Sequence, residues 1–303
     1  MNAIVVYNDK AGVGENGSDS PTPETLREAF AAAGVLAEIH AAHGNDLVAA
    51  LRQAVEQRPD AVYAGGGDGT IATAATYLVD TGIPLGVIPL GTLNHFARDI
   101  GVPIPWREAV PALAAAPIRA VDVAEVNGRI FINNCSLGSY AEAVRRRDGL
   151  RRARGLGKWR AMILASWSVF RELRRLRLQI ETPDRTVSLR TPFVLVANNR
   201  YTGHVLSSSL RPHLNEGRLW LYTTRAHRHL ALVRLMWQSL TRRIDAADEL
   251  EVHSLTEASI SISRGSLPVA ADGEIIDVQP PLSFRIRPAA LLVLAPTPAA
   301  TVQ

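Results

Sequence analysis

The segment Gly65-Gly66-Gly67-Asp68-Gly69-Thr70 follows the apolar residues Ala61–Ala64, which predict a strand, and precedes a helical pattern over Ile71–Asp80. Glycines at a strand-to-helix turn let backbone amides approach phosphate oxygens, and the helix start adds the positive end of its dipole. The carboxylate of Asp68 can reach a metal ion or a phosphate-bound water. The segment predicts a phosphate-binding loop rather than a plain turn, because a turn requires fewer glycines.

Around this segment, the first 120 residues alternate β-branched runs with helical patterns, which predicts a parallel sheet covered by helices. Thr22 and Pro23 mark one helix start clearly, because the hydroxyl caps the helix and proline suits its first position. We expect a Rossmann-like α/β domain over residues 1–120. Its predicted strands are Ala3–Tyr7, Leu36–His40, Ala61–Ala64 and Leu85–Ile88, and its predicted helices are Pro23–Ala33, Asp46–Gln57, Ile71–Asp80 and Arg107–Ala115.

From Val121 on, strands joined by turns replace this alternation, which is typical of an antiparallel β-sandwich or barrel. Asn127-Gly128, between the predicted strands Val121–Val126 and Arg129–Asn133, is the strongest turn signal. Helical patterns over Leu156–Leu173 and His227–Arg243 interrupt the strands. We expect a β-rich second domain over residues 121–295, with the tail 296–303 frayed or packed back.

Composition excludes several classes of protein. Hydrophobic residues make up 47% and charged residues 20% of the 303-residue chain, which fits two globular domains rather than a disordered chain. The one cysteine, Cys135, permits no internal disulfide, and its apolar neighbours predict a buried small residue. The N-terminus lacks the pattern of a secretory signal, and no apolar run reaches the roughly 20 residues of a membrane span. We therefore expect a cytoplasmic protein.

A second loop, Pro89-Leu90-Gly91-Thr92-Leu93-Asn94, follows the next predicted strand, so it is expected at the same sheet edge, where open α/β proteins bind ligands. Together the two loops resemble the catalytic domain of the diacylglycerol kinase family, which carries a Gly-Gly-Asp-Gly-Thr loop and a later Gly-Thr-x-Asn segment. Asn8-Asp9-Lys10-Ala11-Gly12, Asp122 and Asp272-Gly273-Glu274 match further family positions in the same order. The resemblance covers nearly the whole chain.

The chain departs from the family pattern in a few places. Asp9 and Ala11 replace a proline and a serine of the first loop, and His95 stands where many members have Asp. Asn215-Glu216 aligns with an Asp-Asp pair that looks like a structural magnesium site in some bacterial members. Because one carboxylate is missing here and hard cations prefer several, this second metal site and a plain hairpin turn stay equally open.

The resemblance implies an ATP- and Mg²⁺-dependent lipid kinase that phosphorylates a hydroxyl of a diacylglycerol-like lipid, with its site in the cleft between the two domains. It implies that Asp68 and Asp122 hold the metal ion. It also implies that Asp68, Asp272 and Glu274 are the catalytic residues, with Asp272 or Glu274 as the general base. The alternative for the Asp272–Glu274 segment is a β-turn. The implied nucleotide site consists of Asn8, Lys10, Gly66, Gly67, Gly69, Thr70, Thr92, Asn94, Arg154 and Arg160.

A basic block over Arg145–Arg177 contains twelve basic residues against Asp148 and Glu172. Arg154 and Arg160 resemble two arginines of sphingosine kinases that contact nucleotide phosphate, a task that suits the bidentate guanidinium. The other arginines predict either peripheral binding to an anionic membrane surface or a solvated face. Few aromatic residues are interleaved with them, so we do not expect nucleic acid as a partner. A homodimer stays open.

Three other interpretations compete. A Gly-x-Gly-x-x-Gly pattern at Gly12–Gly17, with Glu38 about 20 residues on, fits a dinucleotide-binding fingerprint, but Ser18–Pro23 delays the helix that this fingerprint needs. An NAD-kinase-like phosphotransferase shares the Gly-Gly-Asp-Gly-Thr loop, although the Gly-Thr-Leu-Asn segment argues against it. A nucleotide-sensing membrane-surface module without turnover is the third, and the intact Asp68 and Asp272 count against it. The sequence does not select the acceptor among diacylglycerol, phosphatidylglycerol, a sphingoid base and a polyprenol-like alcohol.

Overall fold

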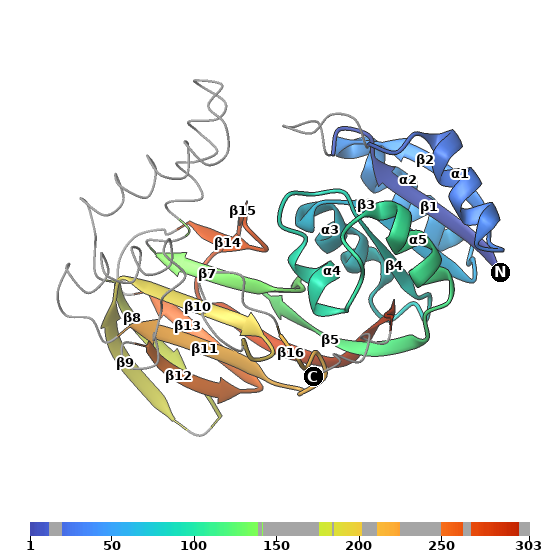
Figure 1. Cartoon of the computed structure of the whole chain (residues 1–303). Helices are drawn as coiled ribbons and strands as arrows, with labels where there is room; N and C mark the ends of the chain where they lie inside the picture. The colour runs from blue at the N-terminus through green and yellow to red at the C-terminus, as the bar shows by residue number, and fades with distance from the viewer. Residues whose placement is uncertain are drawn as a thin grey trace. The chain divides into compact units, whose positions relative to one another are not determined.

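The chain divides into two compact units, one formed by Met1–Val123 with the residues from Pro288, the other by Ala124–Arg287 (Figure 1). The structure, a computed structural model, describes residues 1–11, 20–138, 141, 176–183, 185–201, 211–224, 250–262 and 268–296. The Gly12–Gly17 pattern, most of the basic block and the two helical patterns of the second domain lie outside the described residues.

The first unit is built on a parallel sheet with the strand order β2-β1-β3-β4. The register pairs Tyr7 with Gly65 and Gly66 with Pro89, which brings the carboxyl ends of three strands to one edge. All residues of β3 are buried, as expected for a strand with both faces covered. The predicted parallel α/β domain is confirmed. Its strands are β1 (Asn2–Asn8), β2 (Leu36–Ala42), β3 (Ala61–Gly66) and β4 (Leu85–Pro89).

The helices of this unit pack on the sheet in pairs: α1 lies on β2 and against α5, whereas α2 lies on β1 and against α3 (Figure 1). α1 begins as predicted, because the Thr22 side chain accepts the Thr25 N–H and Pro23 is the first helical residue. Phe30 of α1 meets Tyr63 of β3 edge to face, with 4.7 Å between ring centroids. The helices are α1 (Pro23–Ala32), α2 (Gly44–Glu56), α3 (Asp68–Leu78), α4 (His95–Asp99) and α5 (Trp106–Ala114).

Two helix starts differ from the prediction. α3 begins at Asp68 rather than at Ile71, so Asp68, Gly69 and Thr70 form its first turn. The short helix α4 was not predicted, because a segment of this length is too short to show a helical period. α3 therefore starts inside the first glycine loop, and α4 starts directly after the second.

The second unit is an antiparallel β-sandwich, as predicted. One sheet has the order β12-β11-β10-β7-β14-β15, and the other contains β16-β13-β8-β9 with β5 and β6. Buried and exposed residues alternate strictly along β8, which is the pattern of a strand with one face on the core. The strands are β5 (Ile118–Val126), β6 (Arg129–Phe131), β7 (Asn134–Gly138), β8 (Leu176–Glu181), β9 (Thr186–Thr191), β10 (Phe193–Asn198), β11 (Leu219–Thr224), β12 (Leu250–Leu255), β13 (Glu257–Ile262), β14 (Val269–Ala271), β15 (Glu274–Ile276) and β16 (Leu282–Leu294).

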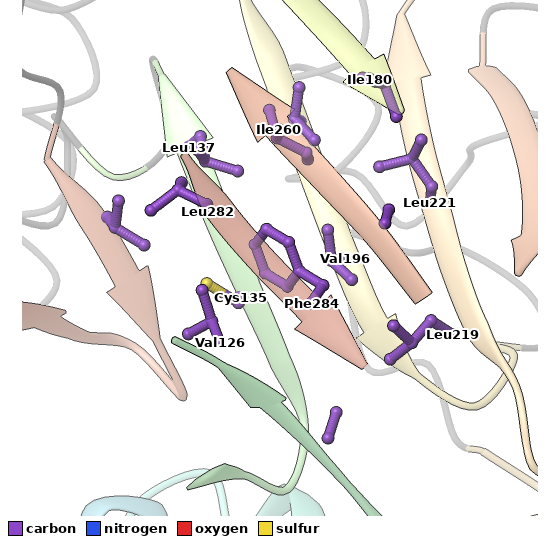
Figure 2. Packing of buried hydrophobic residues seen from close by; sticks show 14 of the residues in the cluster. Val126, Cys135, Leu137, Ile180, Val196, Leu219, Leu221, Ile260, Leu282 and Phe284 are labelled. Atoms are coloured by element: carbon purple, nitrogen blue, oxygen red, sulfur yellow. The ribbon is translucent and has the colours of Figure 1, made fainter. Parts of the chain in front are cut away.

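Both sheets contribute to one apolar core in this unit (Figure 2). Phe284 and Ile260 come from one sheet, Val196 and Leu221 from the other, and each is at most 3% exposed. Cys135 is fully buried in the same core, as predicted, and burial raises the pKa of its thiol. The sandwich is therefore held together by side chains that neither sheet could bury alone.

The strand predicted over Arg129–Asn133 ends earlier than expected, and the strand that follows it was not predicted. β6 ends at Phe131 and pairs with β5, whereas β7 begins at Asn134 and pairs with β10 and β14 in the other sheet. Ile132 and Asn133 carry the chain from one sheet to the other. These two residues and Asn134, the first residue of β7, are called the sheet switch (Ile132–Asn134) below. The sequence does not reveal this change of sheet, because the partners of each strand lie far along the chain.

β16 changes partners along its length. Its first half pairs with β13, as Phe284 does with Ala258, and its second half pairs with β4, as Val293 does with Leu85. The residues from Pro288 therefore belong to the first compact unit, and the extent of the second domain over residues 121–295 stays a prediction. Among the described residues, no helix is long and apolar enough to cross a membrane.

We expect Phe284→Ala to lower the free energy of unfolding of the second unit by about 3–5 kcal/mol, because it leaves a cavity between the sheets. Urea denaturation followed by tryptophan fluorescence measures this change. The matched control is Val252→Ala on β12, where the side chain is 41% exposed, and its cost should stay below about 0.5 kcal/mol. Equal costs for the two variants would contradict the packing described.

Candidate active site

Two glycine loops, one after β3 and one after β4, lie against each other at the carboxyl edge of the parallel sheet. A Cβ atom on Gly91 would lie 2.5 Å from the Cα of Gly67 and 2.8 Å from the Oδ1 of Asn94. The Leu90 N–H donates to the Gly66 carbonyl over 3.0 Å. The predicted convergence of the two loops is confirmed, and residue 91 leaves no space for a side chain.

Steric limits at the end of β3 differ from glycine to glycine. A Cβ on Gly65 would lie 2.6 Å from the Cβ of Tyr7, and one on Gly66 would lie 2.5 Å from the Oγ1 of Thr70. A Cβ on Gly67 would meet only the Cα of Gly91, at an ordinary 3.5 Å. The first two glycines are thus required by packing inside the unit, whereas Gly67 is not.

The start of α3 offers backbone N–H donors at this edge. Its N-cap residue is Gly67, and no side chain caps the helix. The first N–H groups of a helix have no partner within the helix, and the helix dipole adds positive potential there. The N–H groups of Asp68, Gly69 and Thr70 are therefore suited to bind phosphate oxygens.

Asp68 connects the two loops. Its Oδ1 accepts the N–H of Phe96, in the first turn of α4, over 3.3 Å. Asn94, the N-cap residue of α4, makes no capping bond with its own side chain, so a carboxylate from another helix takes that place. A carboxylate has about four acceptor positions, so this bond leaves Asp68 with capacity for a cation.

Asn94 shapes the second loop. It is 4% exposed and has a left-handed backbone with φ of 51°. Its Oδ1 accepts the Gly91 N–H over 2.9 Å, and its Nδ2 donates to the Gly91 carbonyl over 2.8 Å. The side chain thus closes the loop on itself, and its predicted direct contact with the nucleotide stays a prediction. Thr92, at the exposed tip, is open to a ligand.

The first loop turns where β1 ends. The Oδ1 of Asn8 accepts the Lys10 N–H over 3.0 Å, and the Asn8 carbonyl accepts the Ala11 N–H. Lys10 is exposed beside this edge. Asp9, which stands where the family has proline, lies 3.1 Å from Nδ1 of His43. In this chain the contact between Asp9 and His43 restricts the turn, a task that the proline ring performs in the family pattern.

Asp122 is buried, with 2% of its surface exposed. Its Oδ1 accepts the N–H of Ala289 in β16 over 2.9 Å. In this structure the carboxylate joins β5 to the second half of β16, and its predicted role at a metal ion stays a prediction.

Asp272 and Glu274 belong to the second unit, on the β14–β15 hairpin. Asp272 and Gly273 form its turn with φ of 49° and 80°, which is the signature of a two-residue type I′ turn. The β-turn weighed as an alternative is thus the correct backbone structure, while the Asp272 side chain has further contacts. Its Oδ2 accepts the Ile132 N–H over 2.9 Å, and its Oδ1 accepts the N–H groups of Asn133 and Asn134 over 2.8 and 3.2 Å. Glu274 is exposed on an edge strand.

The surroundings of Asp272 suit a proton acceptor. Burial raises the pKa of its carboxyl to about 6, against the opposing effect of the three N–H groups and of the Arg211 guanidinium. A general base works best when its pKa lies near the operating pH. Asp272 is therefore ionised at neutral pH and more basic than an exposed aspartate.

A metal ion fits this site only together with a substrate. Among the described residues, no group of three or more His, Cys, Asp or Glu side chains is arranged to hold one. Mg²⁺ is commonly bound by one or two carboxylates, substrate phosphates and water. Asp68, beside the phosphate-binding start of α3, fits that donor set.

The remaining predicted ligands are less favoured or not described. The Glu216 carboxylate accepts the indole N–H of Trp220 over 2.9 Å, and the Glu216 N–H donates to Asn199. These bonds favour the turn over the second metal site. Arg154 and Arg160 lie outside the described residues.

Family models match both parts of the chain. The diacylglycerol kinase catalytic domain matches residues 2–126, and the YegS C-terminal NAD kinase beta sandwich-like domain matches residues 133–295. The chain belongs to the diacylglycerol kinase family. The resemblance drawn from the sequence motifs is confirmed, and the two matches meet near the boundary at which the chain passes from one unit to the other.

Individual relatives agree with this family. A Chromohalobacter salexigens protein named probable lipid kinase YegS-like is 29% identical over 76% of this chain and 75% of its own length. An uncharacterized Synechocystis protein is 27% identical over 83% of this chain, but the chain covers only 59% of it. The crystal structure described as a diacylglycerol kinase from Bacillus anthracis has a TM-score of 0.73 at 20% identity and covers 97% of this chain and 96% of its own, which confirms the two-domain fold.

Three residues around Asp272 escaped the sequence analysis: Asn133, Asn198 and Arg211. Two asparagine pairs, Asn133-Asn134 and Asn198-Asn199, interrupt or end apolar runs, and buried polar side chains need hydrogen-bond partners. That rule could have singled out the asparagines. Nothing in the sequence around Arg211 distinguishes it from the other arginines.

We expect Gly91→Ala to destabilise the first unit by about 1–3 kcal/mol, because the new methyl group would collide with the main chain at Gly67. Chemical denaturation measures the change. Gly67→Ala is the matched control from the facing loop and should cost only about 0.5 kcal/mol, because its methyl group meets an ordinary contact and only the N-cap preference of glycine is lost. A tolerated Gly91→Ala would contradict the close approach of the loops.

Proposed function

We propose that this chain is an ATP- and Mg²⁺-dependent lipid kinase that phosphorylates a hydroxyl group of a diacylglycerol-like lipid. One observation carries the proposal: the uncapped start of α3, the Asp68 carboxylate and the Gly91 loop meet at one sheet edge. Backbone donors for phosphate and a carboxylate for a cation are what phosphoryl transfer requires of a nucleotide site. Family membership and the names of relatives support the kinase class.

In this proposal the first unit holds the nucleotide. The N–H groups at the start of α3 bind the phosphates, and the exposed Lys10 and Thr92 approach them from the neighbouring loops. Mg²⁺, when bound, supplies neutralisation of the charge that develops on the terminal phosphate. Asp68 holds it, and the bond to the Phe96 N–H keeps that carboxylate in place.

Asp272 serves as the general base. It accepts the proton of the lipid hydroxyl as the hydroxyl oxygen attacks the γ-phosphorus, and the bond to the bridging oxygen breaks to release ADP. Its raised pKa supports this assignment, whereas Glu274 is exposed on an edge strand. Asp68 and Asp272 belong to different units, so turnover requires that both act on the same pair of substrates.

The lipid class rests on relatives and on charge. The matching catalytic domain is described as that of a diacylglycerol kinase, and the Chromohalobacter relative is named a lipid kinase. Twelve basic residues over Arg145–Arg177 favour peripheral association with an anionic membrane, where such an acceptor resides.

A specific observation also keeps an NAD-kinase-like phosphotransferase as a second candidate. The family model that matches residues 133–295 is described as NAD kinase beta sandwich-like. A nucleotide-sensing module without turnover is the non-enzymatic alternative, and it would need neither the base at Asp272 nor an acceptor site.

The deciding experiment incubates the full chain with radiolabelled ATP and Mg²⁺, with vesicles of a total membrane-lipid extract in one arm and NAD in another. We expect label in the lipid phase, and diacylglycerol added to the vesicles should increase it. Label in NAD with none in lipid would establish the NAD-kinase alternative. ATP binding without transfer to any acceptor would establish the non-catalytic module.

Asp68→Asn should lower lipid phosphorylation about 100-fold or more, because the site loses the charge that retains the cation. The amide oxygen can still accept the Phe96 N–H, so the fold should remain. Asp46→Asn, at an exposed position in the first turn of α2, is the matched control and should leave activity unchanged. Full activity of Asp68→Asn would remove this residue from its proposed role.

The rate should also depend on pH through Asp272. Its pKa is raised to about 6, so the carboxyl is protonated below that pH and cannot accept a proton. We expect kcat/KM for the lipid to fall as pH decreases through about 6. A profile that stays flat down to pH 5, where exposed carboxyls are still ionised, would exclude Asp272 as the base.

A further inference from the structure

A single peptide group joins Asp272 to a buried arginine. The N–H of Asn133 donates to the Asp272 Oδ1 over 2.8 Å. The carbonyl of Ile132, at the other end of the same peptide group, accepts from Nη1 of Arg211 over 2.6 Å. A cation at the oxygen and an anion at the hydrogen polarise the peptide in the same direction, so each bond strengthens the other.

Arg211 is held in one orientation by several acceptors. Its Nη1 also donates to the Asn198 carbonyl over 2.9 Å, and its Nη2 donates to Oδ1 of Asn133 over 2.6 Å. The guanidinium lies 5.6 Å from the ring centroid of Tyr201. The planar guanidinium presents its donors to these acceptors in a fixed geometry, which the flexible lysine side chain does not.

Burial makes this cation costly. Arg211 is 1% exposed. Removing a charge from water costs several kcal/mol unless other charges and hydrogen bonds compensate. Neutral donors could close a turn at lower cost, as Asn198 does when its Nδ2 donates to the same Ile132 carbonyl over 2.9 Å. The positive charge therefore calls for a reason beyond closing the sheet switch.

Other ionisable groups near Asp272 do not supply that reason. Glu274, on the same hairpin, is exposed. Cys135 lies opposite Ala271 in the sheet, and burial keeps its thiol neutral. Among the described residues, Arg211 is the cation that acts on the Asp272 carboxyl.

We propose that Arg211 is a positioning residue for the reaction: through the Ile132–Asn133 peptide it orients the Asp272 carboxylate and favours its charged form. This inference rests on the proposed function, in which Asp272 is the base. In this role Arg211 acts through the sheet switch and through its charge. The direction of its effect on the pKa of Asp272, downward against burial, agrees with this role.

The test compares Arg211→Met with Arg211→Lys, because both lose the fork and only the first loses the charge. Two quantities are measured: the pH profile of kcat, and the pKa of Asp272 from carboxyl ¹³C NMR, with Asp272→Asn to assign the signal. In Arg211→Met the pKa and the acid limb should both rise by about one unit, which lowers kcat at pH 6 about 11-fold relative to the variant's own alkaline plateau, against about twofold in the wild type. In Arg211→Lys the acid limb should stay near that of the wild type.

Both variants should also lower the plateau of kcat while the KM for ATP stays unchanged, because the peptide that orients Asp272 is no longer held. If Arg211→Met does not fold, Asn133→Ala replaces it. That change removes one acceptor of the fork but keeps the N–H that Asp272 binds, so it should lower the plateau of kcat without moving the acid limb.

An unchanged pKa of Asp272 in Arg211→Met would overturn the inference. Variants that lose thermal stability while kcat and its pH profile stay the same would overturn it as well. A shifted pKa with an unshifted acid limb would overturn it too, because Arg211 would then not act on catalysis. If the wild type transfers no phosphate to lipid, the proposed function fails, whereas the NMR titration still decides whether Arg211 acts on Asp272.

Discussion

The close approach of two main chains, at Gly67 and Gly91, constrains the candidate nucleotide site more than any other contact. β3 and β4 are neighbours in a parallel sheet, so the loops that leave them must share the same edge. Only a residue without a side chain at position 91 lets them do so. Because the loops touch, Asp68 at the start of one helix reaches the first turn of the next, and Asn94 can close its loop on Gly91.

In the first unit close packing holds the candidate site residues in place, and in the second unit hydrogen bonds do so. The chain leaves one sheet at Phe131 and enters the other at Asn134, and the backbone groups between them lose the partners that a regular strand provides. Asp272 takes the N–H groups of this switch, while Arg211 and Asn198 take the Ile132 carbonyl. A carboxylate used in this way is rigid, partly buried and more basic than usual, so one constraint serves both the fold and the chemistry proposed for it.

The sequence predicted the features that depend on local signals. Thr22-Pro23 marks a helix start, Asn127-Gly128 a hairpin, and the glycine run a loop after a buried strand, because each is a direct consequence of backbone geometry. Features that depend on partners far along the chain could not be predicted in this way. The sheet switch, the length of α4 and the second half of β16 belong to this group. Arg211 belongs to it as well, since its acceptors come from Ile132, Asn133 and Asn198.

The position of β16 has a consequence for folding during translation. The parallel sheet begins with β1, yet it is completed by Val293 beside Leu85, and the Asp122 carboxylate finds its backbone donor at Ala289. A ribosome makes these residues after those of the β-sandwich. The first unit therefore keeps an open sheet edge until the β-sandwich has been translated, which couples the folding of the two units in time.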